Sequence, residues 1–281
     1  MKTRKAFTSD EIAALKPNEK IALVATINYE GLPHVTLLTS LLALDDTHMA
    51  LGEFSKGLSK EYFKKNNSIG FLILTMAMDM WRGKALHTHS AQEGAEYEMF
   101  NEFPMFRYNT YFGINTVHFF DLIQANEKER LPLATIALAY VKTAIARLLA
   151  KQHKDEQPLD TLCMKLFNRM DALKFAAWID DDGFPTIVPL LQAKASDSST
   201  IVFSPGAYSN ELHKLTSGTP LAVYALTLKM ENILTRGVFK GFKRHAGILT
   251  GMLDINYVYN SMPPVHGQIY PKIPLAPVKE F

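Results

Sequence analysis

The sequence contains the same β-hairpin pattern twice. ATINYEGLPHVTLL (25–38) has an alternating apolar run, a polar turn ending in Gly31-Leu32-Pro33, and a second apolar run. AAWIDDDGFPTIVPLL (176–191) repeats this order around Gly183-Phe184-Pro185. Alternation of period two on both sides of a glycine-containing turn is typical of a β-hairpin. A chain that repeats this pattern is constrained to build a similar antiparallel unit twice.

Further matches follow each hairpin in the same order. The hairpin glycines lie 152 residues apart (183 − 31). Phe54-Ser55-Lys56-Gly57 matches Phe203-Ser204-Pro205-Gly206 at 149 residues, and Arg82-Gly83 matches Arg236-Gly237 at 154 residues. A period of this length is much longer than that of a solenoid repeat. We therefore predict a duplicated domain.

Apolar periodicity predicts the elements of both halves. Strands are expected at 20–27, 34–42, 49–52, 69–75, 80–89 and 116–123, and again at 174–179, 186–191, 200–203, 220–226 and 233–239. Helices are expected at 61–66, 93–106, 133–151, 159–170 and 209–216. A Thr-x-x-Glu capping box at 8–11 opens a further helix, which Pro17 ends. The predicted class is mainly β with helices (α+β).

The middle of the chain is rich in alanine and leucine and separates the two halves. We predict a first domain at 1–126, a helical connector at 127–171 and a second domain at 172–281. The connector either packs against the two domains or offers a docking face to another subunit. Further dimerisation of the chain is part of the second interpretation.

The two halves differ in the polar loop after the third strand. The first copy, Ser55 to Lys65, has four lysines, two serines and a glycine at the start of a helix. Free N–H groups at a helix start and lysine ammonium groups both favour a phosphate. The second copy, Ser204 to Lys214, has Pro205 in the place of Lys56. The loop of the first half is therefore the better anion site, unless it is only a solvated lysine-rich surface.

Composition excludes several classes of protein. The net charge is +2, which argues against a broad nucleic-acid surface. Cys163 is the single cysteine, so no internal disulfide can form, which fits a reducing compartment. The N-terminus lacks the apolar segment of a signal peptide, and no stretch approaches 18 uncharged apolar residues. We expect a cytoplasmic protein without a membrane span.

The order of these motifs resembles the FMN-binding split β-barrel family, the pyridoxamine 5′-phosphate oxidase-like superfamily. The resemblance covers about residues 18–125 and, more weakly, 172–260. It rests on Ala25-Thr26-Ile27 with Gly31 to Val35, Ser55 to Lys60, Phe63 to Asn66 before Ile69-Gly70-Phe71, and Arg82 to Ala85. The arginine-rich substrate and phosphate residues of the oxidase itself are not evident. The tandem arrangement also differs from that enzyme.

The resemblance implies where a cofactor binds. Family members are usually dimers with FMN in the interface, so it implies two split β-barrel domains that form an intrachain pseudo-dimer. It places Ser55, Lys56, Ser59 and Lys60, in a loop and helix at 55–66, on the flavin phosphate. It places Leu38, Thr39 and Ser40 along the isoalloxazine ring, with Arg82 beside it. The second half would contribute Tyr257 and Asn260 from the run 256–264, which otherwise only closes the second domain.

Three functions remain open. The first is an FMN-binding oxidoreductase acting on an unknown small molecule, with catalytic residues unassigned. Motifs for dinucleotide, nucleoside-triphosphate or serine-elbow chemistry are absent from the sequence, as expected where a cofactor supplies the reaction. The second is a non-catalytic module of the same fold that holds haem, a deazaflavin or another ligand. The third is a structural pseudo-dimer whose sites have decayed.

Other polar motifs receive simpler interpretations. His87 and His89 lie two apart in a strand, which puts them on one face as a metal pair, but no third ligand is spaced nearby. We predict no metal there. His118 lies in an apolar strand and is interpreted as a core histidine with satisfied hydrogen bonds. Asp180-Asp181-Asp182-Gly183 is interpreted as a hairpin turn rather than a cation loop.

Overall fold

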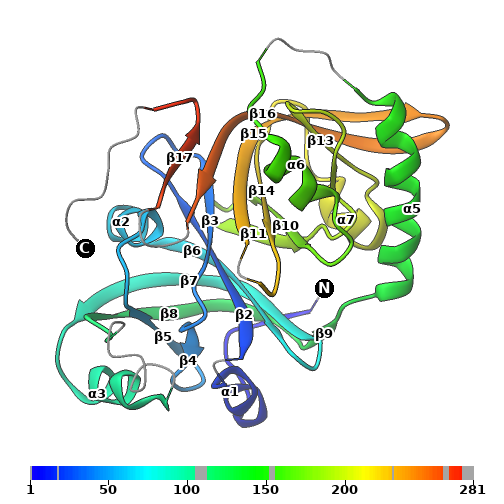
Figure 1. The fold of residues 1–281 in the computed structure, drawn as a ribbon. Helices are drawn as coiled ribbons and strands as arrows, with labels where there is room; N and C mark the ends of the chain where they lie inside the picture. The colour runs from blue at the N-terminus through cyan, green and yellow to red at the C-terminus, as the bar shows by residue number, and fades with distance from the viewer. Residues whose placement is uncertain are drawn as a thin grey trace. The chain divides into compact units, whose positions relative to one another are not determined.

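The computed structural model contains two compact units (Figure 1). It describes residues 2–17, 19–104, 113–151, 156–229, 231–261 and 266–273. The first unit comprises Met1–Gly31, Thr36–Leu131 and Ile179–Thr186; the second comprises Leu32–Val35, Pro132–Trp178 and Ile187–Phe281. The helical segment after Pro132 is thus part of the second unit, whereas the sequence suggested a connector of its own.

The first sheet is antiparallel, with strand order β3-β2-β6-β7-β8-β5-β4. Its strands are β1 (Thr3–Arg4), β2 (Lys20–Ile27), β3 (Pro33–Leu37), β4 (Leu42–Ala43), β5 (His48–Glu53), β6 (Ser68–Thr75), β7 (Asp79–Ala91), β8 (Thr116–Asn126) and β9 (Glu129–Arg130). Its helices are α1 (Ser9–Leu15), α2 (Leu58–Lys65) and α3 (Ala95–Glu102). The strand predicted at 34–42 is wrong in its second part, because β3 ends at Leu37 and a turn at 38–41 precedes β4.

The second sheet repeats this order as β11-β10-β14-β15-β16-β13-β12. Its strands are β10 (Leu173–Ile179), β11 (Pro185–Pro189), β12 (Lys194–Ala195), β13 (Thr200–Phe203), β14 (Pro220–Leu226), β15 (Asn232–His245), β16 (Ile248–Asn260) and β17 (Gly267–Tyr270). Its helices are α5 (Leu133–Leu149), α6 (Thr161–Asn168), η1 (Gly206–Tyr208) and α7 (Ser209–Leu212). Two antiparallel sheets with the same strand order confirm the predicted α+β class in two split-barrel-like domains.

The repeat extends to single backbone hydrogen bonds. The Phe7 N–H donates to the Asp46 carbonyl at 2.8 Å, and 152 residues later the Leu159 N–H donates to the Ser198 carbonyl, also at 2.8 Å. The same offset relates Leu38–Ala22 to Leu190–Lys174, Leu41–Leu38 to Ala193–Leu190, Leu44–His48 to Ser196–Thr200, and Gly31–Asn28 to Gly183–Asp180. Turns and strand entries are therefore built alike in both units, which is consistent with a tandem duplication.

A buried lysine at the start of each sheet is a second shared feature. Lys20 Nζ donates to the carbonyl of Leu15 at the end of α1, at 2.5 Å. Lys174 Nζ donates to the carbonyl of Arg169 just after α6, at 2.8 Å. Each ammonium thus satisfies a carbonyl that a helix end leaves without an intrahelical partner. Burial lowers the pKa of Lys20 to about 8 and that of Lys174 to about 7.

Local sequence signals explain the first helix and both hairpins. Thr8 caps α1, and its capping box with Glu11 is formed as predicted. The Glu11 carboxylate also accepts the Trp81 indole N–H at 2.8 Å, which ties α1 to β7. Gly31 and Gly183 have φ of 77° and 81°, the left-handed region that a glycine adopts at little cost. The predicted hairpin turns therefore form where the sequence places them.

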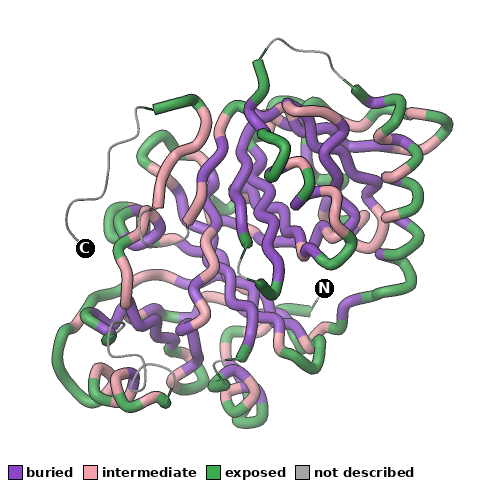
Figure 2. The backbone as a smooth tube through the Cα atoms, viewed as in Figure 1, coloured by how far each residue is buried: buried purple, intermediate pink, exposed green. Residues whose placement is uncertain are grey.

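Apolar side chains fill both faces of the central strands. All eight residues of β2 are buried, although the alternation in its sequence suggested that one face would be more exposed. The core of the first unit includes Val24, Phe71, Trp81 and Phe120. Figure 2 shows the central strands as buried. Among the described residues, no helix combines the length and apolar composition needed to cross a membrane.

Each unit includes a short piece from the other half of the chain. In the first unit, Lys84 Nζ on β7 donates to Asp182 at 2.6 Å and to Asp180 at 3.4 Å. Lys84 Nζ also lies 5.9 Å from the ring centre of Phe184. The acidic turn at 180–183 therefore binds a lysine side chain, and its interpretation as a hairpin turn is confirmed.

Candidate functional site

The loop between β5 and α2 leads into the start of helix α2. Among the described helices of the first unit, only α2 has lysines around its start. The N-cap is Gly57, whose extended backbone (φ −177°) has no side chain to accept the first-turn N–H groups. Lys56 precedes it and is exposed, while Ser55 is half-buried. The helix begins at Leu58, three residues before the predicted start, so Ser59 and Lys60 lie in its first turn. Such a helix start can supply N–H donors to an anion.

Two of the predicted phosphate ligands face inward. Lys60 is buried, and its Nζ donates to the Ser55 carbonyl, which closes the loop. Ser59 is buried, with its Oγ 2.6 Å from Thr36 Oγ1 on β3. Burial lowers the pKa of Lys60, while the carboxylate of Glu53 opposes that shift. The loop is thus held in place by its own polar groups, and Lys56 is the cation that points outward.

Thr36 was not among the residues selected from the sequence. It lies on the second strand of the hairpin, 23 residues before Ser59, and only the tertiary fold brings the two hydroxyl groups together. The available signal was a hydroxyl residue in the short strand PHVTL, where His34 is the other polar residue. Its hydroxyl and that of Ser59 share one hydrogen bond, in which either oxygen can be the donor.

The other predicted ligands from the first half are held by structural contacts. Ser40 is buried and donates to the Gly52 carbonyl at 2.7 Å. Arg82 is buried and forms a two-point ion pair with Glu129, at 3.1 Å to each carboxylate oxygen. Leu38 belongs to the core, and Thr39 is half-buried. Their placement along a flavin ring stays a prediction.

The predicted ligands from the second half lie on β16. Tyr257 is stacked under the Arg236 guanidinium, 4.3 Å from the ring centre, and Asn260 ends the strand. Both are half-buried. Met262, Pro263 and Pro264 from the same run lie outside the described residues. The role of Tyr257 and Asn260 in binding a cofactor stays a prediction.

The equivalent loop of the second unit has a different environment. Here the eight-residue α2 is replaced by the single turn η1 and the four-residue α7. Helix α5 packs on this loop: Thr143 Oγ1 accepts the Ser204 N–H at 2.9 Å, and Ala139 lies directly against Gly206. A backbone donor that an anion could use is thus bonded to α5. The helix predicted at 209–216 is correspondingly too long.

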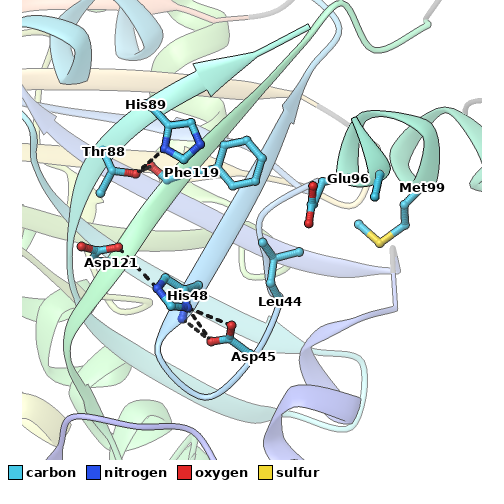
Figure 3. A pocket seen from close by; sticks show the side chains of 10 residues that line it. Leu44, Asp45, His48, Thr88, His89, Glu96, Met99, Phe119 and Asp121 are labelled. Carbon is cyan, nitrogen blue, oxygen red and sulfur yellow. Dashed lines mark hydrogen bonds and ion pairs between the residues drawn. The ribbon is translucent and has the colours of Figure 1, made fainter. Parts of the chain in front are cut away.

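A pocket of about 760 Å³ lies elsewhere in the first unit (Figure 3). Its titratable lining residues are Asp45, His48, His89, Glu96 and Asp121. His48 Nδ1 lies 2.8 Å from Asp45, and this hydrogen bond raises the pKa of His48. None of the ten lining residues is lysine or arginine. Three carboxylates repel a phosphate, so the pocket is a poorer anion site than the 55–60 loop.

The expected side-by-side placement of His87 and His89 is wrong. A β-bulge between them shifts the register, so that His87 pairs with Phe120 and His89 with Phe119. The His87 ring packs on Phe120, while the His89 ring stacks on Phe119 at 4.4 Å, on the opposite face. In the described parts of the chain, no three His, Cys, Asp or Glu side chains gather in a way that could hold a metal ion.

Comparison with known proteins gives likeness of structure only. No family model matches the sequence, and no curated protein matches it. Similar solved structures include an FMN-binding protein from Syntrophomonas wolfei subsp. wolfei (15% identity, 43% of this chain and 83% of that chain, TM-score 0.35). Others are a pyridoxinephosphate oxidase family protein from Clostridium acetobutylicum (18%, 43% and 85%, TM-score 0.33) and an F420 reductase (13%, 44% and 100%, TM-score 0.33). Each covers less than half of this chain.

Proposed function

We propose that this chain binds a flavin-type cofactor, FMN or a deazaflavin, through the loop at 55–60 of the first unit. The observation that carries the proposal is the difference between the two equivalent loops. In the first unit the loop leads into an eight-residue helix with an exposed lysine beside its start. In the second unit, α5 already bonds the corresponding backbone. Of the two equivalent loops, the one in the first unit therefore keeps groups suited to binding a phosphate.

The donors of the first loop fit a phosphate monoester. Lys56 supplies an exposed ammonium, and the first turn of α2 supplies N–H groups. Ser59 and Thr36 supply hydroxyl groups from two elements whose mutual position is fixed by their 2.6 Å contact. Lys60 holds the loop closed from behind. The chain's own residues would therefore bind and orient the phosphate end of the cofactor.

A bound flavin would supply hydride transfer, so the chain needs no nucleophile of its own for that reaction. We propose an oxidoreductase that acts on a small molecule, with FMN as the first cofactor to test. A non-catalytic carrier or sensor for a deazaflavin, haem or another ligand is the alternative. The rate at which an acceptor oxidises the reduced cofactor distinguishes the oxidoreductase from the carrier. A carrier binds the cofactor without accelerating this oxidation by any acceptor.

We expect Lys56→Ala to weaken FMN binding roughly 10-fold, since one charge-assisted hydrogen bond to phosphate is lost. The measurement is a fluorescence titration of the purified full-length chain with FMN. Lys214→Ala, at an exposed lysine of the second unit, is the matched control and should bind as the wild type. Riboflavin, which lacks the phosphate, should bind the wild type and Lys56→Ala with equal affinity.

An equal loss of riboflavin and FMN affinity in Lys56→Ala would mean that this lysine does not contact the phosphate. Wild-type protein that binds neither flavin, but does bind haem, would support the carrier alternative. Protein that binds none of the three would contradict the proposal for the loop as a whole.

We also propose that a second copy of the chain covers the outward face of α5. Leu138, Val141, Ile145 and Leu148 are each about half exposed or more and are spaced by three, four and three residues. These positions are symmetric about residue 143, so an antiparallel pair of α5 helices would place Leu138 against Leu148 and Val141 against Ile145. An interface related by two-fold symmetry requires such self-complementarity.

The expected result is that Val141→Glu with Ile145→Glu changes the mass of the particle from two chains to one. Size-exclusion chromatography with light scattering measures it. Leu228→Glu replaces an apolar side chain of the second unit that is 70% exposed and lies in the turn between β14 and β15, and it should leave the mass unchanged. A wild-type chain that is monomeric at every concentration tested would refute self-association.

A further inference from the structure

A line of hydrogen bonds in the first unit connects a buried carboxylate to an exposed serine. Glu53 Oε2 at the end of β5 lies 2.8 Å from His118 Nε2 on β8. His118 Nδ1 lies 2.7 Å from Ser90 Oγ on β7. Glu53 and His118 are buried, whereas Ser90 is exposed. A nucleophile, a base and a group that orients the base are thus joined in the order that acyl-transfer catalysis uses.

The positions of the protons follow from the partners. Burial would raise the pKa of Glu53, but the hydrogen bond from His118 and the charge of Lys60 outweigh it, so the carboxylate is ionised. It can only accept, and His118 Nε2 must therefore carry the proton it donates. Burial also lowers the pKa of His118, so the ring is neutral and Nδ1 has a free lone pair. That lone pair accepts the Ser90 hydroxyl proton.

The β-bulge after His87 shapes the surroundings of Ser90. The register shift at 87–89 turns His87 towards the same cluster, with its Nε2 3.2 Å from Ser90 Oγ. Burial lowers the pKa of His87 to about 4, so this ring is neutral too. Because Ser90 already donates to His118, His87 Nε2 is the donor in this second contact. The exposed Lys64 on α2 is close enough for its charge to act on both histidines.

We propose that Ser90 is an acyl-transfer nucleophile, with His118 as its general base and Glu53 as the residue that positions His118. Ser90 Oγ attacks the carbonyl carbon of an ester while its proton passes to His118 Nδ1. The ester C–O bond then breaks, and the alkoxide leaves as an alcohol with that proton. Water releases the acyl group from Ser90 by the reverse proton path. No oxidant or cofactor is needed.

The neighbours of Ser90 indicate the class of substrate. The N–H of His87 points at the reacting oxygen and can also reach the carbonyl oxygen, where negative charge develops. Lys64 adds positive charge on the exposed side of the cluster. Small carboxylic esters with an anionic acyl group therefore fit better than neutral or cationic ones. This activity does not use a flavin, and neither Ser90 nor His87 was assigned to the 55–60 loop, although the charge of Lys60 in that loop acts on Glu53 and His118.

The test is labelling of the full-length protein with a fluorophosphonate, followed by mass spectrometry of peptides. We expect one adduct, at Ser90, and none in Ser90→Ala, whose exposed position makes it a mild change for the fold. His118→Gln should label roughly 10³-fold more slowly. Ser209→Ala is the matched control, because Ser209 Oγ on α7 lies 3.0 Å from Nδ1 of His213, the residue that follows this helix, without belonging to the Glu53 cluster. It should label as the wild type.

The pH profile tests the role of Glu53. Labelling should depend on neutral His118 and fall on the acid side below the ordinary histidine value of 6.5. The carboxylate of Glu53 raises the pKa of His118, whereas Lys60 and Lys64 lower it. Glu53→Gln should therefore shift the acid limb to lower pH as well as slow the reaction, which a purely structural role would not do. Wild-type protein that is not labelled at Ser90 would overturn the proposal, as would Ser90→Ala labelled at the wild-type rate.

Discussion

Gly83→Ala and Gly237→Ala are each expected to destabilise the protein by more than about 4 kcal/mol. A Cβ added at Gly83 would lie 2.2 Å from the Gln124 carbonyl oxygen, and one at Gly237 only 1.8 Å from the Asp254 carbonyl oxygen. Ordinary contacts of this kind exceed 3 Å. The obstacle is backbone of the neighbouring strand, so relief requires the strands to separate and lose ladder hydrogen bonds. Chemical denaturation followed by circular dichroism measures the loss.

Gly267→Ala is the matched control for both variants. Gly267 also lies in a strand, β17, but no atom lies within 4 Å of an added Cβ. Its substitution should change stability by less than about 0.5 kcal/mol. If Gly83→Ala were as stable as Gly267→Ala, the close approach of β8 to β7 at this point would be wrong.

These two glycines also show why the Arg-Gly motif repeats. Gly83 pairs with Ala125 and lies against the carbonyl of the residue before it, Gln124. In the same way, Gly237 pairs with Ile255 and lies against the carbonyl of Asp254. The matched sequence therefore encodes a matched backbone approach. Arg82 and Arg236 have diverged, one to an ion pair with Glu129 and the other to a stacked Tyr257. The motif maintains the fold in both units, whatever role Arg82 has towards a cofactor.

Features with local causes could be predicted from the sequence. The capping box of Thr8 and Glu11 joins residues three apart, and the hairpin glycines act within their own turns. The strands at 20–27, 200–203 and 220–226 begin and end where apolar periodicity placed them. Each of these depends on interactions within a few residues, which the linear sequence displays directly.

Features that join distant strands could not be predicted in the same way. His118 was interpreted as a satisfied core histidine, which is confirmed, but its partners lie 65 residues away at Glu53 and 28 away at Ser90. The bulge that separates His87 from His89 depends on pairing with β8. Helix α5 covers the second loop through Thr143, 61 residues before Ser204. No periodicity in the sequence reports such contacts, because they depend on tertiary register.

The inward turn of Lys60 is an intermediate case. The sequence shows its place after Gly57, but a lysine in the first helical turn can point either to solvent or back to the loop. In the structure, Lys60 Nζ turns back to the loop and donates to the Ser55 carbonyl, near the buried Glu53 carboxylate. The charge of Glu53 makes the buried ammonium tolerable. A search for phosphate ligands from the sequence therefore overcounts the lysines available to an anion.

Stability is expected to rise by about 2 kcal/mol between pH 7 and pH 9 through Lys174 alone. Burial, with the charge of Lys194 in addition, lowers the pKa of Lys174 from 10.5 to about 7. Between these two values the unfolded chain binds more protons than the folded chain, so stability increases with pH. Below pH 7 both states are protonated and the cost of the buried charge is present in full. Equilibrium denaturation at several pH values measures the slope.

Lys174→Met should remove most of this slope, because methionine has similar length and no ionisable group. Removal of the buried charge should also stabilise the protein at pH 7. The same change deletes hydrogen bonds to the Arg169 and Leu191 carbonyls, and this loss offsets part of that gain in stability. Lys214→Met, at an exposed lysine of the same unit, should keep the wild-type slope. Lys20 and Lys194, with pKa values of about 8, contribute smaller slopes that remain in the variant. An unchanged slope in Lys174→Met would show that its ammonium is hydrated in the folded protein rather than buried beneath the end of α6.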